Sequence, residues 1–195
     1  MTQLHTITVF AGSADELRKP FLEAAFQLGA LLAQKGLTLV YGGGGTGLMA
    51  ALADGALQAG GEVIGVISAN LNLPRLAHPG LKRMEVFPTI HERQTRLIDL
   101  GDALLALPGG FGTWSELFEA LTWAQIGLHH KPIGLLNTAG YYDLLLAMVN
   151  QAVQEGFLFP EHRALFRISP DPARLLAELE DFTPPAGLSR WLERP

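Results

Sequence analysis

Short apolar runs, rich in β-branched residues, alternate with helical patterns along the whole chain. Strands that are apolar at every position are buried on both faces, which is typical of a parallel sheet between two layers of helices. The expected strands are Thr6–Phe10, Thr38–Tyr41, Val63–Ile67, Met84–Phe87, Ala103–Leu107, Ile133–Leu136 and Phe166–Ser169. The expected helices are Asp15–Lys35, Gly47–Ala59, Thr89–Leu100, Thr113–Ile126, Tyr141–Glu155 and Asp171–Glu180. With right-handed crossovers this alternation predicts an α/β fold: a Rossmann-like, doubly wound parallel sheet with helices on both faces.

A chain of 195 residues is long enough for one domain with a sizeable core. We expect that single domain to span residues 1–182, followed by a flexible tail, 183–195, that contains Pro184 and Pro185. Only 17% of the residues are charged, which suggests that a partner subunit covers part of the surface. The net charge of −5 argues against a nucleic-acid partner, because phosphate neutralisation needs clustered Lys and Arg.

The chain has no cysteine, which excludes disulfides, thiolate nucleophiles and thiolate metal sites. The first ten residues lack the basic start and long apolar run of a signal peptide. No stretch is apolar enough over a sufficient length to span a bilayer. We therefore expect a cytoplasmic protein with no membrane partner.

Glycine-bearing turns follow the first, second and fifth expected strands, at Gly12-Ser13, Gly42–Gly45 and Gly109–Gly112. In a doubly wound sheet, ligands bind at the carboxyl ends of the strands, where all these turns lie. Glycine-rich turns that lead into helices let backbone N–H groups converge on an anion. Their shared position predicts a phosphate-binding site.

The second turn, Tyr41–Leu48, is not a dinucleotide fingerprint. When Gly43 and Gly45 are aligned with the first two glycines of that motif, Leu48 occupies the third position, and the first strand offers only Phe10–Ser13. A redox dinucleotide is therefore not expected. A tight turn with close helix packing would explain part of this segment, but four successive glycines favour a backbone that faces a ligand.

The third turn brings an acid with it, in the sequence Pro108–Glu116. Thr113 and Glu116 have the spacing of a capping box, and capping alone would explain both residues. A simple cap does not require Gly109, Gly110 and Gly112 together. The glycines favour a phosphate cradle with a carboxylate beside it.

Other polar groups have ordinary interpretations. Thr89 and Glu92 also have capping-box spacing. Arg96 is expected to pair with Asp99 on the surface, and the local pattern alone makes Arg93 a solvated surface residue. His129-His130 has no third ligand at a recognisable spacing, so no metal is assigned. Phe118, Leu121 and Trp123 are expected in the core or at a subunit interface.

The run Pro-Gly-Gly-x-Gly-Thr-x-x-Glu over residues 108–116 resembles the signature of the Lonely Guy family of nucleoside 5′-monophosphate phosphoribohydrolases, which also carry the label lysine decarboxylase. The resemblance covers nearly the whole chain. It includes Val9–Ser13, Leu39–Gly44, Gly47–Met49, Gly61–Ile67, His91–Arg93, Leu121–Gln125 and Lys131–Asn137.

The resemblance implies roles by position. The catalytic arginine and glutamate fall on Arg93 and Glu116, and a threonine that contacts the substrate falls on Thr122. The implied phosphate-binding turn comprises Gly109, Gly110, Gly112 and Thr113, and the other turns add Ser13, Gly43 and Gly44 to the expected substrate-binding set. The family is typically dimeric, with active sites near the subunit interface, and uses no metal or organic cofactor.

Several positions depart from the family pattern. Gln94 stands where a lysine follows the catalytic arginine, and Ser115 stands where an acidic residue often precedes the catalytic glutamate. Trp114 replaces a smaller aliphatic residue, and Thr46 lies in the second glycine turn where other polar residues are common. These changes bear on affinity and base preference.

The implied reaction is hydrolysis of the N-glycosidic bond of a purine nucleoside 5′-monophosphate, with adenine or an N6-substituted adenine as the base. One alternative is a non-catalytic nucleotide-binding module of the same fold. Another is a decarboxylase that uses pyridoxal phosphate, which needs a Schiff-base lysine. None of Lys19, Lys35, Lys82 and Lys131 has a convincing context for that cofactor.

Overall fold

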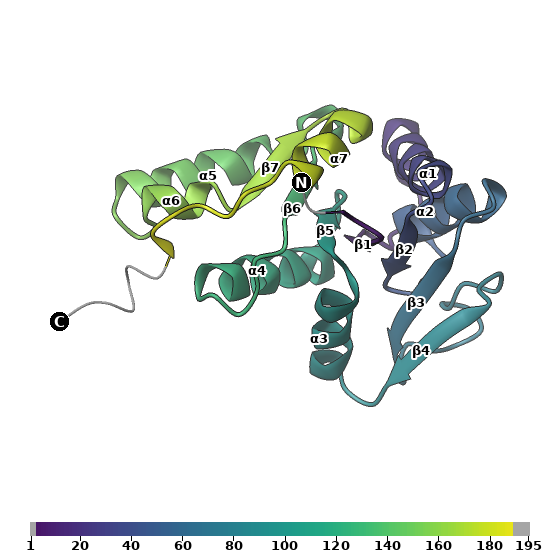
Figure 1. Ribbon diagram of the computed structural model, residues 1–195. Helices are drawn as coiled ribbons and strands as arrows, with labels where there is room; N and C mark the ends of the chain where they lie inside the picture. Colours follow the sequence, from purple (N-terminus) through teal and green to yellow (C-terminus); the bar gives the residue numbers. More distant parts are fainter. Residues whose placement is uncertain (1–2, 189–195) are drawn as a thin grey trace.

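The computed structural model describes residues 3–188, and within them seven parallel strands form one sheet in the order β4-β3-β2-β1-β5-β6-β7 (Figure 1). The strands are β1 (Thr6–Phe10), β2 (Thr38–Tyr41), β3 (Val63–Ser68), β4 (Arg83–Phe87), β5 (Ala103–Ala106), β6 (Ile133–Leu136) and β7 (Phe166–Ser169). This arrangement confirms the Rossmann-like parallel sheet. Residues 189–195 of the expected tail lie outside the described part of the chain.

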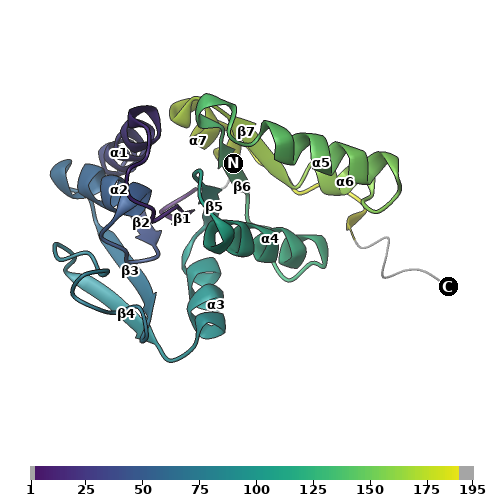
Figure 2. The ribbon, with the colours of Figure 1, turned by 180° about the vertical axis from the view of Figure 1, so that it is seen from behind.

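Helices cover both faces of the sheet. They are α1 (Lys19–Gln34), α2 (Gly47–Gln58), α3 (Ile90–Leu100), α4 (Phe111–Gln125), α5 (Asp143–Gln154), α6 (Pro160–Arg163) and α7 (Pro172–Glu180). Side chains of α1, α2 and α7 share one apolar core with the sheet, and those of α3, α4 and α5 share the other. The helices α3 and α4 lie side by side in both ribbon views (Figures 1 and 2).

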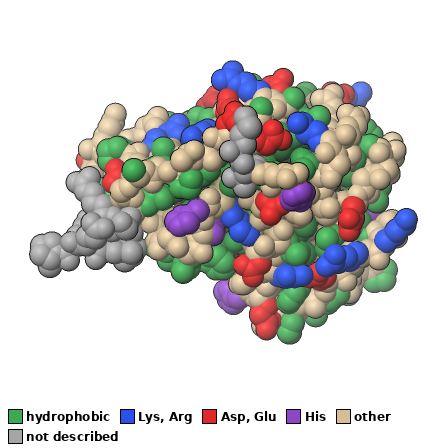
Figure 3. Space-filling model, viewed as in Figure 1, with side chains coloured by type: hydrophobic (Ala, Val, Ile, Leu, Met, Phe, Trp, Pro, Cys, Tyr) green, Lys and Arg blue, Asp and Glu red, His purple; other side chains and the backbone are tan. Residues whose placement is uncertain are grey.

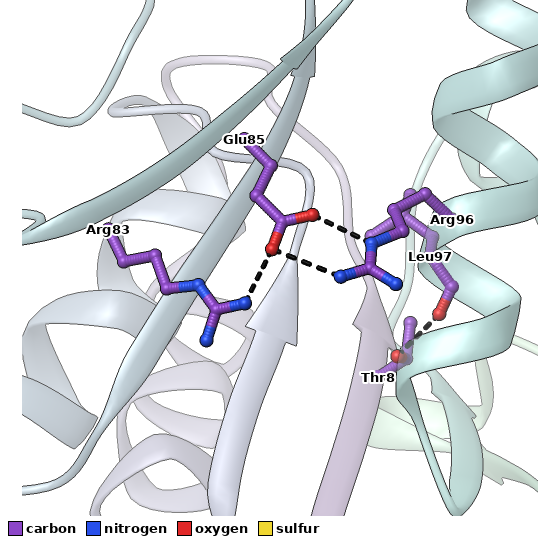
Figure 4. A network of polar contacts seen from close by, with 5 residues as sticks. All are labelled: Thr8, Arg83, Glu85, Arg96 and Leu97. Atoms are coloured by element: carbon purple, nitrogen blue, oxygen red, sulfur yellow. Dashed lines mark hydrogen bonds and ion pairs between the residues drawn. The ribbon is translucent and has the colours of Figure 1, made fainter.

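The central strand β1 shows how alternation builds the two cores. Ile7 and Val9 are buried in the core of α1 and α2. Thr8 is also fully buried, and its Oγ1 donates a hydrogen bond of 2.7 Å to the carbonyl of Leu97 in α3 (Figure 4). This bond satisfies a buried hydroxyl and ties α3 to the middle of the sheet.

The expected pair between Arg96 and Asp99 is wrong, because the partner of Arg96 lies on the edge strand β4. Arg96 instead donates to Glu85 of β4 through Nε at 2.7 Å and Nη2 at 3.2 Å, and Arg83 reaches the same carboxylate at 2.7 Å (Figure 4). The hydrogen bond from Arg96 is the main cause that lowers the pKa of Glu85. A two-point contact across α3 and β4 is geometrically better than a pair along one helix. Basic and acidic side chains lie close together in the lower part of Figure 3, where Figure 1 places β4 and α3.

The helix boundaries differ more from expectation than the strands do. The Thr89–Glu92 capping box of α3 is confirmed. The first helix begins at Lys19 instead of Asp15, because the chain before it turns at Glu16, which has φ +59°, and Pro20 favours the first turn of a helix. The short helices α6 and η1 (Thr138–Gly140) were not expected. No helix within residues 3–188 combines the length and apolar character needed to cross a membrane.

Candidate active site

A cavity of about 520 Å³ lies at the carboxyl ends of β1, β2 and β5. The sheet order makes these strands neighbours, so their three glycine-bearing turns meet there. The lining residues are Ala11, Gly12, Ser13, Ala14, Leu17, Phe21, Gly42, Leu48, Met49, Leu71, Ile90, Arg93, Pro108, Gly109, Gly110, Phe111, Gly112, Thr113, Glu116 and Tyr141. The cavity is therefore apolar over much of its wall, with one cation and one carboxylate.

The charged groups of the cavity, Arg93 of α3 and Glu116 of α4, form an ion pair between Nη1 and Oε1. Both residues are buried, with 9% and 7% of their surface exposed. The Nε of Arg93 also donates to the carbonyl of Val66 in β3 at 3.0 Å. The interpretation of Arg93 as a solvated residue is therefore wrong. Its side chain points inward because the carboxylate and the carbonyl replace the water that it loses.

Burial raises the pKa of the Glu116 carboxyl, and the neighbouring Arg93 opposes that change. The carboxylate of Glu119, on the same helix, adds a smaller increase. A carboxyl whose pKa lies above its usual range is a stronger base once it is ionised. Perturbed acids in clefts are frequent at catalytic sites, so this observation supports a chemical role for Glu116.

The Thr113–Glu116 capping box is wrong, because α4 begins two residues earlier than expected. Its N-cap is Gly110, in extended backbone, and Phe111 is the first helical residue. Thr113 thus lies inside the first turn, where it is buried, and Glu116 lies in the second turn. The first N–H groups of a helix have no acceptor within the helix. Those of α4 belong to Phe111, Gly112 and Thr113, which line the cavity and can receive an anion.

Close backbone approach explains the glycines of the first and third turns. The N–H of Gly12 donates to the carbonyl of Pro108 at 3.2 Å. A Cβ on Gly109 would lie 2.1 Å from Oγ1 of Thr113 and 2.9 Å from the nitrogen of Gly12. Both distances are shorter than a carbon atom tolerates, so the two turns can touch only with glycine at this position.

Of the expected substrate-binding residues, Ser13, Gly109, Gly110, Gly112 and Thr113 line the cavity. The structure places the other three outside its lining. Gly43 packs against Met84 and Ile67, Gly44 forms a β-bridge with Ala77, and Thr122 is exposed on α4, with its hydroxyl bonded to the carbonyl of Phe118.

Gly42 was not singled out by the sequence, yet it lies against the ion pair. A Cβ at this position would be 2.4 Å from Nη2 of Arg93 and 3.0 Å from Sδ of Met49. The guanidinium of Arg93 therefore occupies the space that a side chain at this position would need. A run of four glycines gave no signal for which of them meets the arginine.

Two adjacent tyrosines hold the third glycine turn and were also missed. The hydroxyl of Tyr141 donates to the carbonyl of Gly109, and that of Tyr142 donates to the carbonyl of Leu107 at 2.6 Å. Tyr141 also lines the cavity. Their position after β6, at the carboxyl edge of the sheet, is the sequence signal that could have found them. The apolar wall residues have no such signal because they are dispersed along the chain.

The departures at Gln94 and Ser115 meet in the structure. Nε2 of Gln94 donates to Oγ of Ser115 at 3.2 Å. Trp114, the other departure on α4, is partly exposed and packs edge-to-face on Phe111, with ring centroids 5.4 Å apart.

Within residues 3–188 no lysine lines the cavity, so a Schiff base with pyridoxal phosphate has no candidate there. Lys131 donates instead to the carbonyls of Ile98 and Asp99 at the end of α3, and burial lowers its pKa. In the same described part of the chain, no three His, Asp or Glu side chains gather as metal ligands. His129 contacts the carbonyl of Ala120.

A family model described as "Possible lysine decarboxylase" matches residues 49–179. A probable cytokinin riboside 5′-monophosphate phosphoribohydrolase of Oryza sativa subsp. japonica, LOGL9, is 42% identical over 94% of this chain and 81% of its own. The cytokinin riboside 5′-monophosphate phosphoribohydrolase LOG1 of Arabidopsis thaliana is 39% identical over 91% of this chain and 84% of its own.

Solved structures with the same fold include a molybdenum cofactor binding protein from Rippkaea orientalis, with a TM-score of 0.67 and 25% identity over 91% of this chain and 96% of that chain. The molybdenum cofactor carrier protein of Chlamydomonas reinhardtii has a TM-score of 0.67 and 24% identity, over 90% and 99% of the two chains. The latter likeness concerns the fold alone.

The contact between Gly42 and the guanidinium generates a prediction. We expect Gly42→Ala to fold but to lower the Tm by at least roughly 5 °C, because a Cβ at 2.4 Å from Nη2 of Arg93 displaces the guanidinium from its buried partner Glu116. If the cavity binds AMP, as the sequence leads us to expect, displacement of Arg93 should weaken that binding by at least about tenfold, the usual scale for losing a charge-assisted hydrogen bond. Calorimetric titration with AMP and thermal unfolding measure the two quantities. Unchanged AMP affinity would contradict the prediction.

Proposed function

The chain belongs to the family described as possible lysine decarboxylase, together with the cytokinin riboside 5′-monophosphate phosphoribohydrolases, and we propose that it is a hydrolase of a purine nucleoside 5′-monophosphate. The bond cleaved is the N-glycosidic bond, and the products are the free base, adenine or an N6-substituted adenine, and ribose 5-phosphate. The observation that carries the proposal is the buried Arg93–Glu116 pair beside the glycine turn, in one cavity.

The phosphate is proposed to bind at the start of α4. The N–H groups of Gly110, Gly112 and Thr113 border the cavity there, and the positive end of the helix dipole favours a dianion. The hydrogen bond from Tyr141 to the carbonyl of Gly109 supports a fixed loop. A phosphate held by a fixed loop places the sugar at a set distance from the helix, which is how binding energy is used for orientation.

Glu116 is proposed to act on the sugar. Cleavage of the N-glycosidic bond develops positive, oxocarbenium-like charge on the ribose. A buried carboxylate stabilises that charge more strongly than one in water, and it can also take a proton from the attacking water. Its position in the second turn of α4, one turn beyond the phosphate-binding N–H groups, supports this role.

Arg93 is proposed to hold the substrate and to assist departure of the base. Its guanidinium is anchored by Val66 and Glu116, and it has further N–H groups that can donate to a leaving nitrogen. The apolar wall, which includes Leu17, Phe21 and Met49, supports binding of a flat base.

The non-catalytic alternative is less well supported. Molybdenum cofactor binding and carrier proteins share the fold at 24–25% identity, whereas the phosphoribohydrolases are about 40% identical over most of the chain. A binding module would also have no need for a carboxylate buried beside its phosphate site. The cytoplasmic location stays a prediction from the sequence.

We propose that the chain forms a homodimer through the exposed apolar surface beside the cavity. Ile90, Phe111, Trp114 and Phe118 are 44%, 86%, 39% and 41% exposed and lie on α3 and α4. Apolar surface of this kind is frequent at subunit interfaces. We expect the chain to sediment as a dimer and Phe118→Glu to shift it toward monomer at micromolar concentration. A parent chain that sediments as a monomer would contradict the proposal.

The phosphate role gives a prediction about substrates. AMP should be cleaved with a kcat/KM at least about a hundredfold above that for adenosine, because the phosphate-binding energy orients the sugar. Chromatographic measurement of free adenine, with both compounds at several concentrations, tests this. Isopentenyl-AMP, assayed beside AMP, reports base preference. Equal turnover of AMP and adenosine would sink the phosphate role.

The ion pair gives a prediction about variants. Glu116→Gln is isosteric and should fold, but it should lose at least about two orders of magnitude in kcat, the usual scale for a positioned acid–base group. Arg93→Ala should lose a similar factor. Adenine release from AMP measures both rates, with circular dichroism as the folding control. Near-normal activity of Glu116→Gln would reduce that residue to a structural partner of Arg93.

A further inference from the structure

A second polar contact joins α3 and α4 directly beside the ion pair. Gln94 follows Arg93 in α3, Ser115 precedes Glu116 in α4, and the hydrogen bond between them is 3.2 Å long. Gln94 is only 7% exposed, so its amide is held in place although it carries no charge. The same two helices are thus linked at two consecutive positions, once by ions and once by neutral groups.

The two helices pack mainly on the sheet. α3 lies against β3, β1 and β4, whereas α4 lies against β1 and β5. The sheet and the shared apolar core set the overall position of the two helices, and the contacts Arg93–Glu116 and Gln94–Ser115 join them directly at the cavity. The Arg93–Glu116 pair is itself a hydrogen bond and fixes one distance between the helices; a second hydrogen bond at the adjacent residues also limits rotation of one helix against the other.

We propose that Gln94 and Ser115 are positioning residues for the reaction: their hydrogen bond holds α3 and α4 at the spacing at which Arg93 and Glu116 meet, without placing a further charge beside the carboxylate. The inference rests on the proposed function, because it assigns a role to these residues in that reaction. It adds residues that are not part of the cavity lining.

Neutrality of this contact matters because few charges surround Glu116. Arg93 faces it from α3, and Glu119 lies on its own helix. The strands against which α4 packs, β1 and β5, hold no titratable residue. A cation at position 94 would favour the ionised carboxylate and lower its pKa, whereas an acid at position 115 would raise it further. A neutral amide and hydroxyl do neither.

The first test is a double-variant comparison. Gln94→Leu and Ser115→Ala each remove the hydrogen bond, and each should lower kcat for AMP roughly tenfold with KM little changed. The double variant should be no slower than the slower single variant, because both substitutions break one bond. Losses that multiply in the double variant, an unchanged kcat, or a lowered Tm with unchanged kcat per folded molecule would each overturn the proposal.

The second test uses charge. In the proposed mechanism Glu116 acts as the ionised carboxylate, so kcat/KM should fall as the pH falls through its pKa. Gln94→Lys should move that acid limb to lower pH and Ser115→Glu should move it to higher pH. The double variant, which can form an ion pair at the same place, should return the limb and kcat toward the parent. Single variants that leave the limb unmoved would overturn the proposal.

The control variant is Gln151→Leu, the same exchange at an exposed glutamine of α5 that is not part of the cavity lining. It should match the parent in kcat and in pH profile. The activity of the parent chain on AMP distinguishes failure of the proposed function from failure of this inference. If the parent fails to cleave AMP, the proposed function fails and this inference with it; if the parent cleaves AMP and the variants match it, only the inference fails.

Discussion

Removing the Arg93 guanidinium and the Glu116 carboxylate from water costs roughly several kcal/mol for each ion, and their contact in the cavity recovers that cost only with good geometry. Each ion therefore depends on the other for its stability in the cavity. The guanidinium makes one further hydrogen bond, from Arg93 to the carbonyl of Val66. Much of the surrounding structure can be understood as meeting this condition. The helices must bring the two side chains together, and the backbone nearby must leave room for them.

The order of the strands in the sheet brings the two charged side chains together. Arg93 follows the edge strand β4 and Glu116 follows β5, with three strands between them, yet both reach the carboxyl edge of the sheet. Glycine residues leave the room that the two side chains need. The guanidinium lies where a side chain of Gly42 would be, and the turns of Gly12 and Gly109 touch each other beneath the start of α4. The glycine turns thus serve the ion pair as well as the proposed phosphate site.

The sequence predicted every strand within residues 3–188. The inner strands such as β3, β5 and β6 are unbroken apolar runs because they are buried on both faces, whereas the edge strand β4 is partly exposed and carries Arg83 and Glu85. Helix starts were less predictable. The pattern around Thr113 reads equally well as a cap and as a first turn, and only the extended backbone at Gly110 decides between them. Arg93 could not be predicted as buried from its neighbours, because its partners Glu116 and Val66 are 23 and 27 residues away. Gly42 and Tyr141 were missed for the same reason: their importance comes from contacts across the fold.

The ion pair also means that the charged groups of the cavity are already in place before a substrate binds. In the proposed reaction the field of Glu116 on a developing cation is stronger in a low-dielectric cavity than in water, and Arg93 opposes the rise in the pKa of the Glu116 carboxyl that burial causes. The desolvation cost is met during folding, so little reorganisation is left for the moment of bond cleavage. A guanidinium that moves part of its hydrogen bonding toward a departing base would weaken its hold on Glu116 as positive charge grows on the sugar. The carboxylate would then interact less with the guanidinium and more with the positively charged sugar, without a change in its position on α4.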